Sequence, residues 1–250
     1  MMNKRWSKEV RGLLQKKKRK ESNRFIVEGR KNIEELLRSD LTIECLFYTE
    51  KLHSIIDKYD NKSIAVLQET TAELLKQNGH LQTNDSGLAV VHIPTTSIPH
   101  STDLEDLSLA LDNVKDPGNL GTILRIADWY GIKNIFLSKE CTDAFAPKVI
   151  ASTMGAFTRI NVHQVDLIEL LTQYKQDNIA ILGADMVGTD IHAYKSNQKS
   201  VVVMGSESHG ISENVSGILN EKITIPRYGQ AESLNVAIAT AIICDNIVRK

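Results

Sequence analysis

A polar loop in the second half of the chain combines a tight turn with an amide and a guanidinium. Residues 116–119 read Asp-Pro-Gly-Asn, a strong turn signal, and Arg125 follows six positions after Asn119. These two groups can orient a polar or anionic ligand through directed hydrogen bonds. By itself, however, the pattern favours structural roles, with Asn119 capping the next helix and Arg125 in a surface ion pair.

Two further loops carry polar groups next to glycines or at a helix start. Gly205 and Gly210 enclose Glu207, and glycine lets a backbone approach a ligand closely. The segment contains neither GxGxxG nor GK[ST], so it is not a dinucleotide or P-loop motif. Ser233 and Asn235 lie where a third loop passes into the last helix, where a capping serine is the plain alternative.

All three loops follow predicted strands and lead into predicted helices. Strands are expected at residues 107–111, 135–137, 160–162, 179–182, 201–204 and 223–225, and helices at 120–130, 147–153, 167–174, 214–219 and 234–248. The first part alternates in the same way, with strands at 25–27, 45–48, 64–67 and 88–93 and helices at 30–37, 54–59 and 71–75. This alternation predicts an α/β fold with a largely parallel sheet, in which ligands bind at the carboxyl ends of strands.

The composition indicates a globular protein and excludes several classes. The chain has 250 residues, of which 42% are hydrophobic and 24% charged, values typical of folded domains. We expect no membrane span and no signal peptide, because no apolar stretch is long enough and the N-terminus is basic. Three widely separated cysteines suggest no metal site and no disulfide framework, and they fit a cytoplasmic location.

Positive charge is concentrated at the N-terminus. Residues 1–31 carry a net charge of +9 and the other 219 residues carry −10, and the basic part includes a Lys-Lys-Lys-Arg-Lys run at residues 16–20. A basic arm on an acidic chain indicates a polyanionic partner, such as nucleic acid or a membrane, although a solvated tail is the simpler alternative.

The three loops together resemble the three motifs of the SpoU/TrmH family of RNA ribose methyltransferases, in the SPOUT class. Residues 112–121 match D-x-V-x-D-P-x-N-x-G at every position, and Arg125 matches the arginine of that motif. Residues 205–210 match G-x-E-x-x-G. Residues 225–239 match I-P-x-x-G-x-x-x-S-L-N-V-x-x-A, with Arg227 in place of the usual methionine.

The resemblance implies two domains. Residues 108–250 are expected to form an α/β-knot (SPOUT trefoil-knot) methyltransferase domain. Residues 1–92 are similar to the family's small α/β/α RNA-binding domain, with the best local match at residues 24–30. Residues 93–107 contain two of the five prolines and several Ser and Thr, as expected of a linker.

The implied activity is S-adenosylmethionine (AdoMet)-dependent methyl transfer to a ribose 2′-OH in structured RNA. Because a separate recognition domain precedes the catalytic one, 23S ribosomal RNA is favoured over tRNA. Two competing hypotheses are a non-catalytic RNA-binding or ribosome assembly factor and an unrelated α/β enzyme. The resemblance also implies a homodimer through the knotted domain, and neither a metal nor a membrane partner.

Site residues are carried over from the motifs or taken from the basic segment. The expected catalytic group is Arg125, Asn119, Glu207, Ser233 and Asn235. The expected cofactor contacts are Met204, Gly205, Ile225, Pro226, Leu234 and Asn235. The expected RNA contacts are Lys16, Lys17, Lys18, Arg19, Lys20, Arg24 and Arg30. A guanidinium stays protonated in proteins, so Arg125 would hold a phosphate or stabilise a developing alkoxide rather than act as a literal base.

Overall fold

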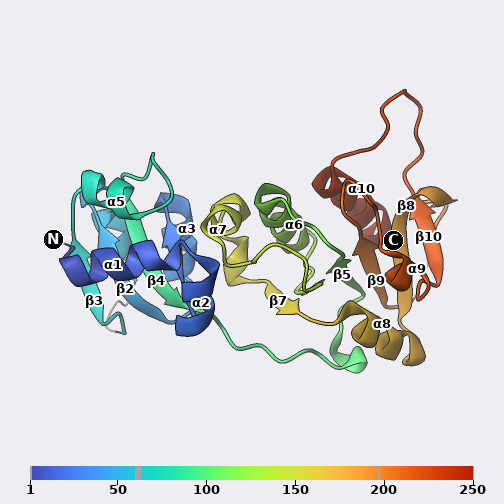
Figure 1. The fold of residues 1–250 in the computed structure, drawn as a ribbon, viewed down its shortest axis with the longest axis horizontal. Coiled ribbons are helices and arrows are strands. Elements are labelled where there is room, and N and C mark those ends of the chain that lie inside the picture. The colour runs from blue at the N-terminus through green and yellow to red at the C-terminus, as the bar shows by residue number, and fades with distance from the viewer. Residues whose placement is uncertain (1, 60–62, 196–197, 250) are drawn as a thin grey trace. The chain divides into compact units, whose positions relative to one another are not determined.

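A computed structural model describes residues 2–59, 63–195 and 198–249, which form two compact units (Figure 1). Unit 1 consists of Met1–Thr95 and Asp143–Arg159. Unit 2 consists of Thr96–Thr142 and Ile160–Lys250. The chain therefore passes between the units three times. It enters unit 2 after Thr95, returns to unit 1 at Asp143 and enters unit 2 again after Arg159.

Unit 1 is built on a four-stranded sheet with the order β1-β4-β2-β3. The strands are β1 (Arg24–Glu28), β2 (Ile43–Tyr48), β3 (Val66–Glu69) and β4 (Gly87–His92). The helices after β1 are α3 (Arg30–Leu37), η1 (Glu50–Leu52), α4 (His53–Ile56) and α5 (Ala72–Asn78). Only β2 and β3 are parallel, so the expected largely parallel sheet is wrong for this unit. The reason is that β4 inserts between β1 and β2 and runs antiparallel to both.

The basic N-terminal segment is folded into helices rather than extended as an arm. Helices α1 (Lys4–Leu13) and α2 (Lys16–Ser22) precede the first strand. In α1, Val10 and Leu13 are fully buried and pack in a cluster with residues of the sheet and α5. Helix α1 thus has an apolar face toward the core and a basic face toward solvent, as expected of a surface helix.

Arg19 differs from the lysines beside it because its side chain is buried. Its guanidinium donates hydrogen bonds to the carbonyls of Leu13 and Leu14, at 2.8 and 2.9 Å. It also forms an ion pair with Asp143, with Nη2 2.7 Å from Oδ2. A buried arginine paired in this way is held as part of the structure, so the expectation that Arg19 is an exposed RNA contact does not fit its position.

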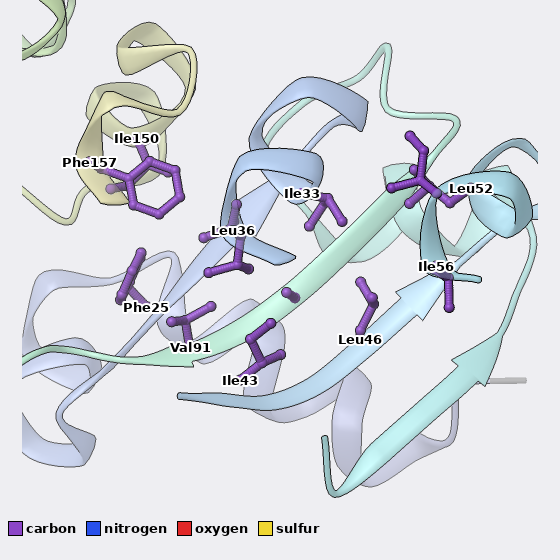
Figure 2. Packing of buried hydrophobic residues seen from close by; sticks show 13 residues of the cluster. Phe25, Ile33, Leu36, Ile43, Leu46, Leu52, Ile56, Val91, Ile150 and Phe157 are labelled. Carbon is purple, nitrogen blue, oxygen red and sulfur yellow. The ribbon is translucent and has the colours of Figure 1, made fainter. Parts of the chain in front are cut away.

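The segment Asp143–Arg159 contributes to the core of unit 1. It contains α7 (Pro147–Thr153) and η3 (Ala156–Thr158). Ile150 and Phe157 belong to a buried cluster with Phe25 and Leu36, and Figure 2 shows these side chains gathered together. The Phe25 and Phe157 ring centroids are 6.0 Å apart in an edge-to-face arrangement, which adds to the stabilisation from burial. The segment lies within residues 108–250 yet packs with the first unit.

Glu35 of α3 fixes the end of this segment. Its carboxylate accepts hydrogen bonds from Lys31 and Arg159, both at 2.6 Å. Its side chain lies against Gly155, whose φ is +100° and whose added Cβ would come within 2.3 Å of the Glu35 Cγ. Lys31 first, and then Arg159, hold the pKa of Glu35 below its usual range, against the opposing effect of burial.

Unit 2 has a six-stranded sheet in which all neighbouring strands are parallel, in the order β10-β8-β9-β5-β6-β7. The strands are β5 (Leu107–Leu111), β6 (Asn134–Leu137), β7 (Asn161–Gln164), β8 (Ala180–Asp190), β9 (Ser200–Met204) and β10 (Glu221–Thr224). The helices are η2 (Ser101–Asp103), α6 (Pro117–Trp129), α8 (Leu167–Gln176), α9 (Glu213–Ser216) and α10 (Val236–Val248). The parallel sheet predicted from the sequence is confirmed here, whereas the trefoil knot stays a prediction.

Helices flank the central strands of this sheet. Leu171 and Tyr174 of α8 and Val215 of α9 pack in one cluster with Ala110 of β5 and Val203 of β9. Helices α6 and α10 contact each other. Strands β5 and β9 are buried along their whole length, as is typical of parallel strands covered on both faces.

Across the described ranges, no helix combines the length and apolar character needed to span a bilayer.

The packing of Asp143–Arg159 predicts a pH dependence. Replacing Glu35 with Gln should lower the free energy of unfolding by about 1–2 kcal/mol at neutral pH, because two charge-assisted hydrogen bonds are weakened. The folded pKa of Glu35 lies below the unfolded value, so this stabilisation is complete above pH ~4.3 and is lost as the pH falls through the folded pKa. Urea unfolding of the wild type and E35Q should therefore converge in acid.

Glu34→Gln is the matched control, since it removes an ion pair with Arg38, the C-cap of α3, and keeps both Glu35 hydrogen bonds and the 3.8 Å ion pair between Arg38 and Glu35. A constant stability difference between E35Q and the wild type from pH 7 to pH 3 would contradict the prediction.

Candidate active site

The first two polar loops meet at the carboxyl ends of the two central strands of the sheet in unit 2. Strands β5 and β9 pair in parallel, with Leu111 opposite Met204, so their carboxyl ends lie side by side. The Asp112 N–H donates to the Met204 carbonyl at 2.9 Å, and the buried Asp112 carboxylate accepts from the Ser212 N–H at 2.7 Å. Asp112 therefore joins the start of the first loop to the end of the second.

The loop at residues 205–211 folds tightly on itself. Ser206 and Gly210 exchange backbone hydrogen bonds of 3.0 and 2.9 Å, and Gly210 has a φ of +66°. A Cβ on Gly205 would lie 2.1 Å from the Gly210 carbonyl carbon. Glycine is thus required at 205 by the loop's own backbone, a reason other than the close approach of a ligand inferred from the sequence.

The helix after the first loop begins three residues earlier than predicted. Its N-cap is Asp116, whose carboxylate accepts from the Asn119 N–H at 2.8 Å, and Pro117 occupies the first helical position. The prediction that Asn119 caps this helix is wrong, because Asp116 already accepts the free backbone N–H and proline is well suited to the next position. The Asn119 side chain is left to make other contacts.

Those contacts join all three loops. The Asn119 Nδ2 donates to the Glu207 carboxylate, and its Oδ1 accepts from the Asn235 Nδ2 at 3.0 Å. Asn235 is also the N-cap of α10, with its Oδ1 accepting from the Ala237 N–H at 3.0 Å. The structure therefore brings three of the five expected catalytic residues into one exposed hydrogen-bonded network with fixed amide orientations.

A cavity of about 470 Å³ borders this network. It is lined by the expected cofactor residues Met204, Gly205, Ile225, Pro226 and Leu234, and by the expected catalytic residues Glu207 and Ser233. Asn235 is next to the lining residue Leu234 but does not itself line the cavity among the described residues. A volume of this size is in the range of small-molecule sites.

The cavity wall contributed by β8 was not predicted from the sequence. Ala184, Asp185 and Met186 line the cavity where β8 extends past its buried half. Lys222 pairs with Asp185 at 2.7 Å and holds the pKa of that carboxyl below its usual range. The available signal was weak, because the predicted strand ended at residue 182 and the Gly-Ala-Asp-Met sequence after it matches no distinctive motif.

Arg125 stands apart from the network in the single chain. It is exposed and, within residues 2–59, 63–195 and 198–249, its side chain makes no hydrogen bond or ion pair. It shares an exposed stripe of α6 with Thr122 and Trp129, at the three- and four-residue spacing of one helix face. Trp129 is 82% exposed, unusual for so large an apolar side chain.

The expected RNA contacts are distributed over unit 1. Lys16, Lys17 and Lys20 are exposed on α2 and Lys18 is half-buried, whereas Arg19 is buried as described above. Arg24 pairs with Glu9 and Glu44, at 2.8 and 2.7 Å. Arg30 is exposed and donates to the Lys51 carbonyl at 2.9 Å. Lys17 and Lys18 have only long ion pairs, at 3.9 Å to Glu21 and 4.0 Å to Glu9, so the lysines of α2 retain charge available to a partner, whereas Arg24 is held closely by two carboxylates.

The three thiols of the chain are free and buried. Burial raises the pKa of Cys45 and Cys244 to about 12, and it also raises the pKa of Cys141. In the part of the chain that the structure describes, no group of three or more His, Cys, Asp or Glu side chains is arranged to hold a metal ion.

Comparison with known families gives matches to both parts of the chain. Residues 106–245 match the SpoU rRNA Methylase family, and residues 6–89 match the MRM3-like substrate binding domain. The first match covers more than half of the chain.

Individual relatives match over nearly the whole length. The 23S rRNA (guanosine(2553)-2'-O)-methyltransferase RlmP of Bacillus subtilis is 28% identical over 237 residues, which is 94% of this chain and 93% of that one. A solved structure described as an RNA methyltransferase of the TrmH family, from Porphyromonas gingivalis, is 32% identical, with a TM-score of 0.89 and full coverage of both chains. The AdoMet-bound rRNA methyltransferase of Sinorhizobium meliloti is 27% identical, with a TM-score of 0.84 over 97% of this chain and 93% of that one.

The tight loop at 205–211 predicts a specific sensitivity. Gly205→Ala should displace the loop, because its Cβ cannot lie 2.1 Å from the Gly210 carbon, and should weaken AdoMet binding at least tenfold by calorimetry. Gly229→Ala is the control, since Gly229 also lines the cavity but has open space around its Cβ. Equal AdoMet affinity in the two variants would refute this account of the loop.

Proposed function

The chain belongs to the SpoU rRNA methylase family, and we propose that it transfers a methyl group from AdoMet to a ribose 2′-OH of large-subunit ribosomal RNA. The observation that carries the proposal is the Asn119–Glu207–Asn235 network at the border of the 470 Å³ cavity. The substrate class is supported by the full-length similarity to RlmP and by the substrate binding domain matched at residues 6–89.

The cavity residues fit AdoMet in size and chemistry. Met204, Ile223 and Ile225 line the cavity with apolar side chains, which suit an adenine ring. The tight 205–211 loop places backbone groups along the wall, which suits a ligand with both polar and apolar parts. When bound, AdoMet would supply a methyl group on a sulfonium, with a neutral thioether as the leaving group.

The residues of the chain then have to position a ribose and help its hydroxyl lose a proton. We assign Asn119, Glu207 and Asn235 to orientation of the ribose or cofactor, because their mutual hydrogen bonds fix where each amide and carboxylate points. Ser233 would contribute a hydroxyl at the cavity wall. Alignment of reacting groups can supply on the order of 7–11 kcal/mol of a barrier, so such orientation is a sufficient task.

Arg125 is assigned to the RNA phosphate or the developing alkoxide. Its guanidinium is a bidentate donor that remains charged, and in the chain it is exposed and without an ionic partner among the described residues. This placement supports a site completed by a second subunit, so we propose a homodimer through unit 2. The exposed Trp129 of α6 and the exposed Ile238 and Val248 of α10 offer apolar surface for that contact.

The proposed location is the cytoplasm, because a cellular RNA substrate is found there and a reducing compartment keeps the three thiols unpaired.

We further propose that unit 2 carries out catalysis and that unit 1 recognises the RNA. The exposed lysines of α2 favour this division, because phosphate contacts supply sequence-independent affinity for RNA.

Arg125→Ala tests the proposed function directly. It should leave AdoMet affinity unchanged and reduce methyl transfer to ribosomal RNA by at least a hundredfold, since loss of one donor to a developing charge costs about that much. Tritiated AdoMet, ribosomal RNA from cells lacking the gene and, in a parallel arm, tRNA from those cells provide the assay.

Lys133→Ala is the matched control, because Lys133 is an exposed cation at the amino end of β6, the opposite end of that strand from the loops. Wild-type transfer by R125A would remove Arg125 from the mechanism. Transfer to tRNA alone would overturn the ribosomal substrate, and AdoMet binding without transfer to either RNA would overturn the enzymatic function.

The basic face of α2 predicts a salt effect. Substituting Lys16, Lys17 and Lys20 with Gln should weaken RNA binding and reduce the slope of log affinity against log salt by about two. The reason is that each phosphate contact formed on binding releases counterions, and the variant forms three fewer such contacts. Deleting residues 1–20 is a poorer test, since it removes the buried Val10, Leu13 and Arg19.

The same three positions changed to Arg should keep the wild-type slope, since the charge is retained. If the Gln and Arg variants showed the same slope in filter binding, α2 would not contact phosphate.

A further inference from the structure

The mouth of the cavity carries an unusual amount of uncovered apolar surface. Tyr228, Met186 and Leu234 all line the cavity and are 93%, 54% and 47% exposed. The whole run of residues 227–235, between the last strand and the last helix, is exposed. An aromatic ring that is both exposed and next to a small-molecule site is poorly explained by packing within the chain.

The residue before Tyr228 in the sequence is a cation that also lines the cavity. Arg227 is the one lysine or arginine among the described residues that line the cavity. Its guanidinium makes a long hydrogen bond of 3.4 Å to the Ala231 carbonyl, so most of its donors face solvent.

We infer that Arg227 and Tyr228 form the surface that receives the nucleotide to be methylated, with the Tyr228 ring stacked on its base and Arg227 paired with an adjacent phosphate. The inference rests on the proposed function and adds a recognition surface to it. Sequence-specific RNA recognition uses unstacked bases held on aromatic rings, with cations on the backbone.

The position and charge of the pair favour RNA over the carboxylate of AdoMet as its ligand. The pair lies on the exposed loop, at the solvent side of the cavity, rather than on its buried wall. Unit 2, residues 96–142 and 160–250, has 11 Lys and Arg against 17 Asp and Glu, a net charge of −6, so a phosphate approaching it needs a local cation. The same cavity is bordered by Glu207 of the catalytic network, so a base on Tyr228 would bring its ribose toward that network.

Four variants test the inference: Tyr228→Ala, Tyr228→Phe, Arg227→Met and, as matched control, Gln230→Ala. Gln230 is exposed in the same loop but does not line the cavity among the described residues. Tyr228→Ala should raise the KM for ribosomal RNA about tenfold with kcat within a factor of about two, whereas Tyr228→Phe should keep the wild-type KM because stacking is retained. Arg227→Met should raise the KM and lower the salt slope by about one.

AdoMet affinity by calorimetry and molar mass by light scattering separate the competing explanations. The KM increases expected above support the inference if AdoMet affinity and molar mass are unchanged in all four variants. Weaker AdoMet binding in R227M with an unchanged KM for RNA would assign Arg227 to the cofactor and overturn it, as would a lower molar mass for Y228A, which would place the ring in a subunit contact. An effect of Gln230→Ala equal to that of Tyr228→Ala would also overturn it.

Failure of the proposed function gives a different result. In that case the wild type transfers no methyl group, and filter binding of ribosomal RNA to the four variants still compares the surface directly. Weaker binding by Y228A and R227M would keep it as an RNA surface, and equal binding by all four would overturn it.

Discussion

The parallel pairing of β5 with β9 is the constraint on which the site depends. The strands are about ninety residues apart in sequence, yet their registered pairing places Leu111 beside Met204 and starts two loops at the same edge. Asp112 then fixes both loops, because one buried residue bonds to Met204 through its backbone and to Ser212 through its carboxylate. With β8 on the other side of β9, one further part of the cavity wall comes from the next strand of the same sheet, and the rest from β10, the loop after it and α10.

The polar groups assigned to the proposed site are of two kinds, which differ in how far the chain has already fixed their orientation. Asn119, Glu207 and Asn235 restrain one another, so their orientation needs no ligand. Arg125 and Arg227 are exposed and have few bonds of their own, so their ordering must come from whatever binds. Fixed groups suit the orientation of a small sugar, and free guanidinium groups suit a phosphate backbone whose position is set only on binding.

The sequence was sufficient where the pattern is local. Leu107–Leu111, Arg30–Leu37 and Pro147–Thr153 have the predicted bounds, because each carries its own periodicity. The three loops could be grouped by resemblance, and the structure joins two of them through Asp112 and all three through Asn119.

The features that were not predicted depend on distant residues or on close local competition. Helix α2 lies in a run of charge without apolar periodicity, and the burial of Arg19 depends on Asp143, 124 residues away. The cap of α6 required a choice between Asp116 and Asn119, which are comparable capping residues. The sheet direction in unit 1 depends on where β4 inserts, which periodicity does not specify.

The excursion of Asp143–Arg159 into unit 1 has a consequence for synthesis of the protein on the ribosome. When residue 95 has emerged, Phe25 still lacks Phe145 and Phe157, and Arg19 still lacks Asp143. The N-terminal unit therefore cannot complete its core until residue 159 has been translated, by which time β5 and β6 of the second sheet have also been made. Domains usually fold in order of synthesis, but here the first must wait for part of the second, and a nascent chain stalled between them would expose aromatic surface.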